Sequence, residues 1–324
     1  MSTANLLLVG TAATFAIVML SLVLLTGYGG HVSLAQLTFT GVGALVYCKL
    51  DQPTLLGLLI SALVAAGVGA LVALPVLRLT GLYLALATLA FASIMDKMVF
   101  QADWAFGFNN VLPAGRLSFL GHTVSSTGGY VFVMTVFFVL TGWAVLLIRR
   151  GVVGRMLIAM RDSPAACGTL GLDQRWFRVG LFAVSAGIAG LAGALFAGLR
   201  QTVGAGDFIY FNSLLLLLCA TVFGVTSVTG AVLGGVALML LPQLRADHPS
   251  AAGLLFVVLA VGAVLLAKDP NGLASQMFKL GRWVERRIAP RIRANLPSLP
   301  SAGGDSELEG SVAEEPEGVP AHAH

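Results

Sequence analysis

Three polar side chains recur at helical spacing in an apolar stretch near the start of the chain, residues 27–44, GYGGHVSLAQLTFTGVGA. Ser33, Gln36 and Thr40 are three and four residues apart, so on a helix they lie on one face. Amides and hydroxyls both donate and accept hydrogen bonds. The stripe can therefore join neighbouring helices or line a path for a polar solute, with Gln36 as the main contact. Ser33, after the glycine-rich turn, is also the predicted helix N-cap.

A second apolar stretch, residues 80–92, TGLYLALATLAFA, contributes two further polar side chains, Tyr83 and Thr88. We include both among the candidate residues of a substrate pathway. Tyr83 has an alternative role, because a tyrosine near the end of a membrane span commonly anchors it at the interface.

Side chains suited to catalysis or metal binding are not grouped in this sequence. His31 has no acidic neighbour nearby, and Cys48, Cys167 and Cys219 lack the spacing of a metal site or a redox pair. An intramembrane enzyme would need paired catalytic groups within its spans. The Gly-x-x-x-x-Gly-Lys-Ser/Thr loop that binds nucleotide phosphates is also missing. We expect no enzymatic activity, cofactor or metal, and no nucleic-acid partner.

The composition places the chain in a membrane. Hydrophobic residues make up 57% and charged residues 10% of its 324 residues, with a mean hydropathy of +0.90, whereas soluble domains are nearer a quarter charged. Apolar runs long enough to cross the bilayer recur from the N-terminal region to residue 267. We predict an all-α, polytopic transmembrane helix bundle with about nine spans, eight to ten, some short or broken. The candidate spans are Leu6–Leu25, Val32–Cys48, Leu55–Leu77, Gly81–Phe100, Tyr130–Ile148, Phe177–Leu199, Ile209–Phe223, Val228–Leu241 and Ala251–Ala267.

Lys and Arg gather in loops that alternation of nine spans places on one side. Basic flanks are retained in the cytoplasm, so we predict the N-terminus outside and the C-terminus inside. Residues 1–267 form the predicted transmembrane domain, with a cytoplasmic loop at 149–176 and an external loop at 101–129. Trp104, Phe106 and Phe108 in that external loop suit the interfacial belt. A basic juxtamembrane segment, 268–300, could attract anionic lipid, and an acidic tail, 301–324, is expected to be disordered.

The cytoplasmic loop contains a predicted short helix. Asp162 or Ser163 can cap its start, Pro164 suits its first position, and Gly171 can end it. Its small side chains, including Ala165 and Ala166, could fit closely into a cleft of another protein, with arginines such as Arg161 steering the approach. The alternative is an ordinary basic loop.

The span after this loop carries two adjacent rows of small residues at intervals of four. The rows are Ala186, Gly190, Ala194 and Gly198, and Ser185, Ala189, Gly193 and Ala197. Such rows let neighbouring helices approach closely. We predict a rigid, centrally packed helix attached directly to the short one.

Five stretches together resemble the integral-membrane permeases of branched-chain amino-acid ABC importers, a family that also includes urea and short-chain amide permeases. They are Gly27–Ala44, Gly81–Phe91, Gly154–Asp173, Ala186–Gly198 and Ser213–Gly235. The Tyr-Leu-Ala-x-x-Thr-Leu stretch at Tyr83–Leu89 is similar to that of the longer of the two permease types.

The resemblance implies a permease subunit in a bacterial inner membrane that moves a small amino acid or amide-like solute. It implies pairing with a second related permease, two cytoplasmic ATPase subunits that supply ATP hydrolysis, and an extracytoplasmic solute-binding protein. Ser163–Gly171 would be the coupling helix that contacts an ATPase.

A stand-alone ion-coupled secondary carrier is the alternative function. Such a carrier needs an ion-coupling carboxylate within the membrane. Asp96 is predicted to lie near the end of its span, so the sequence favours the ATP-driven permease.

Overall fold

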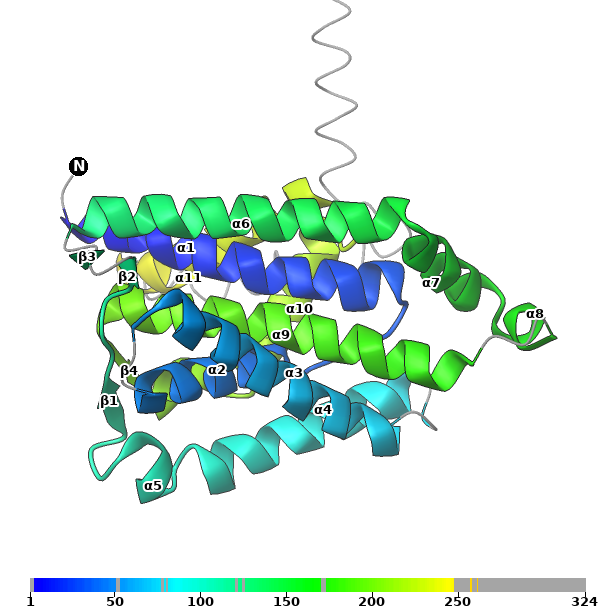
Figure 1. The fold of residues 1–324 in the computed structure, drawn as a ribbon, viewed down its shortest axis with the longest axis horizontal. Coiled ribbons are helices and arrows are strands. Elements are labelled where there is room, and N and C mark those ends of the chain that lie inside the picture. Colours follow the sequence, from blue (N-terminus) through cyan, green and yellow to red (C-terminus); the bar gives the residue numbers. More distant parts are fainter. Residues whose placement is uncertain are drawn as a thin grey trace, which may run out of the picture. The chain divides into compact units, whose positions relative to one another are not determined.

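The chain divides into two units, Met1–Phe278 and Lys279–His324. The structure, a computed structural model, describes residues 3–50, 53–76, 79, 81–119, 122–123, 126–169, 173–247, 257 and 261. All of these lie in the first unit, which Figure 1 shows as a bundle of helices. The predicted segments 268–300 and 301–324 fall outside the described residues.

Helices dominate the described residues, with a few strands of two or three residues at one end. The α-helices are α1 (Thr3–Leu22), α2 (Gln36–Leu50), α3 (Leu55–Val76), α4 (Leu82–Ile94), α5 (Asp103–Phe106), α6 (Thr127–Arg150), α7 (Val152–Asp162), α8 (Pro164–Thr169), α9 (Gln174–Arg200), α10 (Asn212–Phe223) and α11 (Val228–Asp247). Two π-helical segments, η1 (Val23–Tyr28) and η2 (Met95–Val99), extend α1 and α4, and η3 (Ala205–Phe208) is a 3-10 turn. The strands are β1 (Val111–Pro113), β2 (Ser118–Phe119), β3 (His122–Thr123) and β4 (Thr202–Gly204).

Eight of the nine predicted spans coincide with helices of the structure, and the ninth, 251–267, lies almost wholly outside the described residues. Within the described part, five helical stretches are long and apolar enough to cross a membrane: Thr3–Tyr28, Leu55–Pro75, Leu82–Val99, Thr127–Arg150 and Gln174–Arg200. Two shorter apolar helices, Asn212–Phe223 and Val228–Leu240, follow them. The predicted helical-bundle class is confirmed, while the number of spans and the sides of the termini stay predictions.

Local side-chain caps explain where two of the long helices begin. The Asp173 carboxylate accepts a hydrogen bond from the Arg175 amide at 3.0 Å before α9. The Ser126 hydroxyl accepts one from the Gly129 amide at 3.1 Å before α6. Both satisfy an amide that would otherwise lack a partner in the first helical turn.

The predicted N-cap role of Ser33 is wrong. Helix α2 begins at Gln36, and the Ser33 hydroxyl instead accepts a hydrogen bond from the Ala35 amide at 3.4 Å within the preceding turn. The next amide in this turn, that of Leu34, is bound by the Thr88 hydroxyl of α4 at 3.0 Å. This tertiary contact holds the segment before Gln36 out of the helix.

Helix α9 occupies the centre of the bundle, and its most extensive contacts are with α3 and α2. In Figure 1 it lies between the α1–α6 pair and the α2–α3 pair. A Cβ added at Gly193 would overlap the carbonyl oxygen of Thr40 in α2. One added at Gly190 would overlap the Cβ of Ala65 in α3. The backbones therefore approach so closely that these positions have no room for a side chain.

The two small-residue rows of α9 face different neighbours. In the row that holds Gly190, Ala186 lies against Gly69 of α3. In the other row, Gly193 faces α2. Ala194 is fully buried, and Gly198 lies against the Tyr130 ring of α6. Together the rows give close contact with α2, α3 and α6, as small-residue packing in membranes allows.

The predicted external loop, 101–129, is partly folded. Strand β1 pairs antiparallel with β4, with Val111 opposite Gly204, and β2 pairs with β3. Trp104 and Phe108 are exposed, but Phe106 is fully buried. Its ring lies 5.7 Å from that of Phe100 and 6.4 Å from that of Phe208. The expected place of Phe106 in an interfacial belt is therefore wrong, because α5 turns it into this aromatic cluster.

Substituting Gly193→Ala should destabilise the protein, because the added methyl group must push α2 and α9 apart. We expect a loss of about 1–3 kcal/mol, as for other overpacked cores, seen as a lower thermal unfolding midpoint of the purified protein. Gly67→Ala in α3 is the matched control, since a Cβ there meets nothing within 4 Å. Equal midpoints for the two variants would contradict the close α2–α9 contact.

Candidate functional site

A buried polar network joins α1, α2 and α9 at Gln36. The Gln36 Oε1 accepts a hydrogen bond from the Ser21 hydroxyl at 3.1 Å, and its Nε2 donates to the Ser185 hydroxyl at 3.0 Å. The Ser185 hydroxyl in turn donates to the Ser21 carbonyl oxygen at 2.9 Å. All three residues are at most 1% exposed, so this closed set of bonds links three helices in the interior.

The other residues predicted beside Gln36 are also bonded to backbone groups. The Thr40 hydroxyl donates to the Gln36 carbonyl oxygen at 2.9 Å. The Thr88 hydroxyl donates to the Ala85 carbonyl oxygen at 2.9 Å, besides accepting from the Leu34 amide. Thr88 is thereby brought next to the segment that holds Ser33 and Gln36. A solute path along these groups requires the surrounding helices to separate.

Tyr83 does not join this group. It is 71% exposed, on the outer side of α4. An exposed tyrosine near a helix end suits the interfacial role that the sequence also allowed.

Sequence reasoning missed Ser21 and Ser185 as the partners of Gln36. Ser185 stands in one of the small-residue rows of α9, and Ser21 is one of three hydroxyl residues in the first apolar run. A third serine, Ser213 of α10, accepts a hydrogen bond from the Leu37 amide at 3.3 Å and so holds the start of α2 from another side. The available signal in the sequence was the presence of single serines within long apolar runs, where each needs a hydrogen-bond partner.

The predicted cytoplasmic loop contains two helices, α7 and α8, where one was expected. Helix α8 begins at Pro164 as predicted, and the Ser163 carbonyl oxygen accepts from the Cys167 amide at 3.3 Å. Ala165 and Ala166 lie within α8, whereas Gly171 falls outside the described residues. Asp162 ends α7 and Ser163 lies between the two helices; both are exposed.

Helix α7 is amphipathic and was not predicted. Gly154, Leu157 and Met160, at intervals of three, form its buried side. The intervals match one face of a helix. This spacing is visible in the sequence, but the high charge of the segment favoured its interpretation as a loop.

Arg161, the last basic residue of α7, binds the end of η1 and the turn that follows it. Its Nη1 donates to the Gly27 carbonyl oxygen at 2.6 Å, and its side chain packs against Gly30. The neighbouring Arg149 guanidinium lies 5.4 Å above the Tyr28 ring. The end of α7 is thus attached to the segment that leads into α2.

His31 lies in this same turn, beside the Phe182 ring at a centroid distance of 6.3 Å. Burial, and secondly the charge of Arg178, lower the pKa of His31 to about 4. His31 is therefore neutral near pH 7. Among the described residues, no group of three His, Cys, Asp or Glu side chains could hold a metal ion.

Substituting Gln36→Met keeps a side chain of similar length but removes both interhelical hydrogen bonds. At about 0.6 kcal/mol for each such bond in a membrane, we expect a loss of about 1 kcal/mol of unfolding free energy. Thr135→Val is the control, because that hydroxyl bonds only within α6, to the Val131 carbonyl oxygen. A Gln36→Met midpoint no lower than that of the control would show that the network contributes nothing to stability.

Comparison with known proteins agrees with the resemblance of the five stretches. The profile of the family described as "Branched-chain amino acid transport system / permease component" matches residues 4–267. The chain is 29% identical to the high-affinity branched-chain amino acid transport system permease protein LivM of Escherichia coli, over an alignment covering 79% of this chain and 65% of LivM. LivM of Salmonella typhimurium is 28% identical with the same coverage. No solved structure matched.

The chain therefore spans about 65% of the length of these curated relatives. The family match covers almost the whole described helical unit, including the Gln36 network, α7, α8 and α9. On this match the chain belongs to the branched-chain amino acid transport system permease family.

Proposed function

We propose that this chain is the membrane-spanning permease subunit of an ATP-binding-cassette importer. It would move a small amino acid or amide-like solute across the bacterial inner membrane, with branched-chain amino acids as the first candidates because LivM is named for them. The observation that carries the proposal is the family match across residues 4–267. A second related permease, two ATPase subunits and an external solute-binding protein would complete the transporter.

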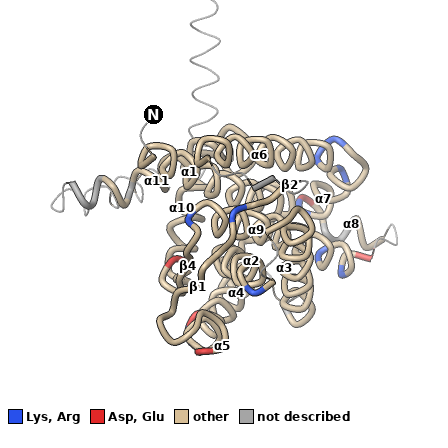
Figure 2. The backbone as a smooth tube through the Cα atoms, turned by 60° about the vertical axis from the view of Figure 1, so that its left-hand side comes forward, with Lys and Arg blue, Asp and Glu red and all other residues tan. Residues whose placement is uncertain are grey.

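Helices α7 and α8 are the proposed contact with an ATPase. Figure 1 shows α8 beyond the ends of the long helices, on the far side of α7. Figure 2 shows that Lys and Arg gather near α7, α8 and the adjacent end of α6. Because basic flanks are retained in the cytoplasm, this end of the bundle is the proposed cytoplasmic side.

Two connections can carry motion from this contact into the bundle. One is the direct contact between α8 and α9. The other is the hydrogen bond from Arg161 to the Gly27 carbonyl oxygen, which leads to the turn before α2. Since α9 also packs directly on α2 and α3, the three helices would move as one group during alternating access.

The solute path would open where the polar side chains of α2 and of the turn before it meet α4. Ser33, Gln36, Thr40 and Thr88 supply hydroxyls and one amide without a net charge, which suits a neutral or zwitterionic solute. In the described conformation, the Gln36 amide is bound to Ser21 and Ser185. Opening would exchange these bonds for bonds to the solute.

The ATPase contact can be tested by crosslinking through α8. In a Cys167→Ala background, Ala166→Cys should form a bismaleimide crosslink to a coexpressed ATPase subunit, detected as a shifted band on a gel. Gly206→Cys is the control, because Gly206 is exposed in η3 at the opposite end of the bundle and a Cβ there meets nothing within 4 Å. A crosslink from the η3 position but not from α8 would contradict the proposal.

Asp96 is the one observation that favours the carrier alternative. Its carboxylate is buried in η2, and its ion pair with the exposed Lys97 ammonium is long, at 3.9 Å. Carboxylates within membrane spans commonly serve ion coupling. In this chain Asp96 lies near the end of the Leu82–Val99 stretch, which suits a structural role better.

Asp96→Asn should leave the KM for uptake within about twofold, because an ATP-driven permease needs no titrating carboxylate. Uptake by cells should stop when the partner ATPase is inactivated, for the wild type and the variant alike. Uptake that persists without the ATPase, collapses with the proton gradient and is lost in Asp96→Asn would establish the carrier instead.

A further inference from the structure

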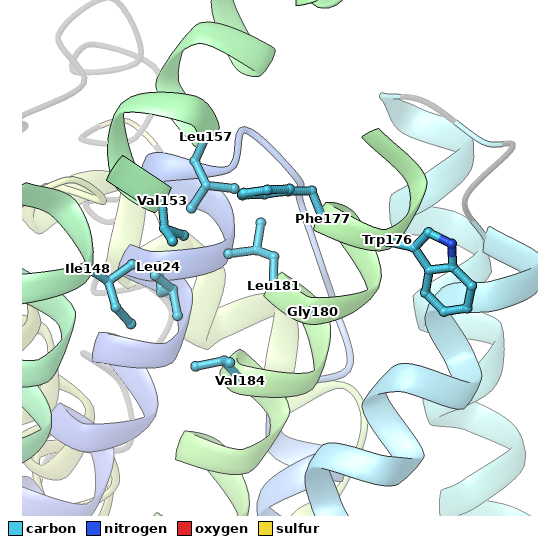
Figure 3. Close-up of a pocket in the computed structure, with 9 residues that line it drawn as sticks. All are labelled: Leu24, Ile148, Val153, Leu157, Trp176, Phe177, Gly180, Leu181 and Val184. Atoms are coloured by element: carbon cyan, nitrogen blue, oxygen red, sulfur yellow. The ribbon is translucent and has the colours of Figure 1, made fainter. Parts of the chain in front are cut away.

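An apolar groove of about 480 Å³ lies where α6, α7 and α9 meet the end of α1. Figure 3 shows its lining, with Leu157 and Val153 of α7, Phe177 and Leu181 of α9, and Ile148 of α6 directed toward one another. Leu24 of η1 lies behind them. These side chains carry no hydrogen-bonding group, so the groove suits a hydrocarbon and excludes a polar solute.

One glycine, Gly180, and one tryptophan, Trp176, mark the open side of the groove. A Cβ at Gly180 would meet nothing within 4 Å, so the helix surface there faces open space. Trp176, 69% exposed, points away from the other lining side chains in Figure 3. A tryptophan in this position is typical of the level where lipid tails meet headgroups.

Positive charge lies at the same end of the groove. Arg149 and Arg150 directly follow Ile148 of the lining, and both are exposed. The Arg149 guanidinium lies over the ring of Tyr28, one helical turn beyond Leu24 of the lining. Figure 2 shows this concentration of basic residues at the end of α6 and along α7. An occupant that joins a hydrocarbon chain to a negative headgroup would match both features.

We propose that this groove is a binding site for an anionic phospholipid, with an acyl chain along Leu157, Phe177 and Leu181 and the phosphate at Arg149 and Arg150. The lipid would fill the space between α7 and α9, next to the proposed ATPase contact. A protein partner fits less well, because protein interfaces carry polar groups among their apolar contacts, and this lining has none besides the Trp176 indole.

Native mass spectrometry of the full-length chain tests the site. The chain in detergent is equilibrated with equal amounts of phosphatidylglycerol and phosphatidylcholine that carry the same acyl chains. We expect one retained phosphatidylglycerol per chain, in preference to phosphatidylcholine. Gly180→Leu should lower that retention by on the order of tenfold, because the leucine takes the place of several buried methylenes. Gly67→Leu, at an open position of α3 away from the groove, should retain it.

Substitutions of the arginines test the contact with the lipid headgroup separately from the contact with the acyl chain. Replacing Arg149 and Arg150 by Gln, singly and together, should reduce the preference for phosphatidylglycerol by about fivefold for each charge removed. Equal retention of the two lipids by the wild-type chain would overturn the proposal, as would unchanged retention in Gly180→Leu. In the assembled transporter the lipid should remain bound; its loss on assembly, together with failure of Gly180→Leu to assemble, would assign the groove to a protein partner.

Discussion

The close approach of α9 to α2 and α3 is the constraint on which the rest of the bundle depends. In a bilayer, apolar helices gain no hydrophobic free energy by leaving lipid for protein, so contact must come from dispersion and hydrogen bonds. Gly190 and Gly193 allow that contact because any side chain there would overlap α2 or α3. The Gln36 amide then adds hydrogen bonds at the same interface, to serines of α1 and α9. Shape brings the backbones together, and the polar network fixes their register.

This arrangement gives α9 two roles. At one end it contacts α8, and along its length it is packed into the centre of the bundle. Because α8 contacts α9, a displacement of α8 would reach α2 and α3 through α9. The Arg161 bond to Gly27 supplies a second route to the same helices. The polar side chains of α2 serve as helix contacts in the described conformation, and in the proposed mechanism they become solute contacts when the group moves.

Much of the fold could be predicted because its strongest signals are local. The apolar runs and the rows through Gly190 and Gly193 follow from periodicity within single segments. The partners of Gln36 could not be predicted, since Ser21 and Ser185 lie 15 and 149 residues away in sequence, and many other hydroxyls were equally eligible. The burial of Phe106 and the pairing of β1 with β4 likewise depend on tertiary contacts between segments too short to carry a pattern. Helix α7 had a pattern, but its charge favoured interpretation as a loop.

The central claim, that α9 moves with α2 and α3 as one group, can be measured directly by electron–electron double resonance in the assembled transporter. Spin labels at the exposed positions of Leu71 in α3 and Trp176 in α9 report on distances within the group. Labels at Trp176 and the exposed Trp143 of α6 report on distances across its boundary. On ATP binding, the α3–α9 distance distribution should stay unchanged while the α6–α9 distribution shifts. A shift between α3 and α9 as large as that between α6 and α9 would contradict the account.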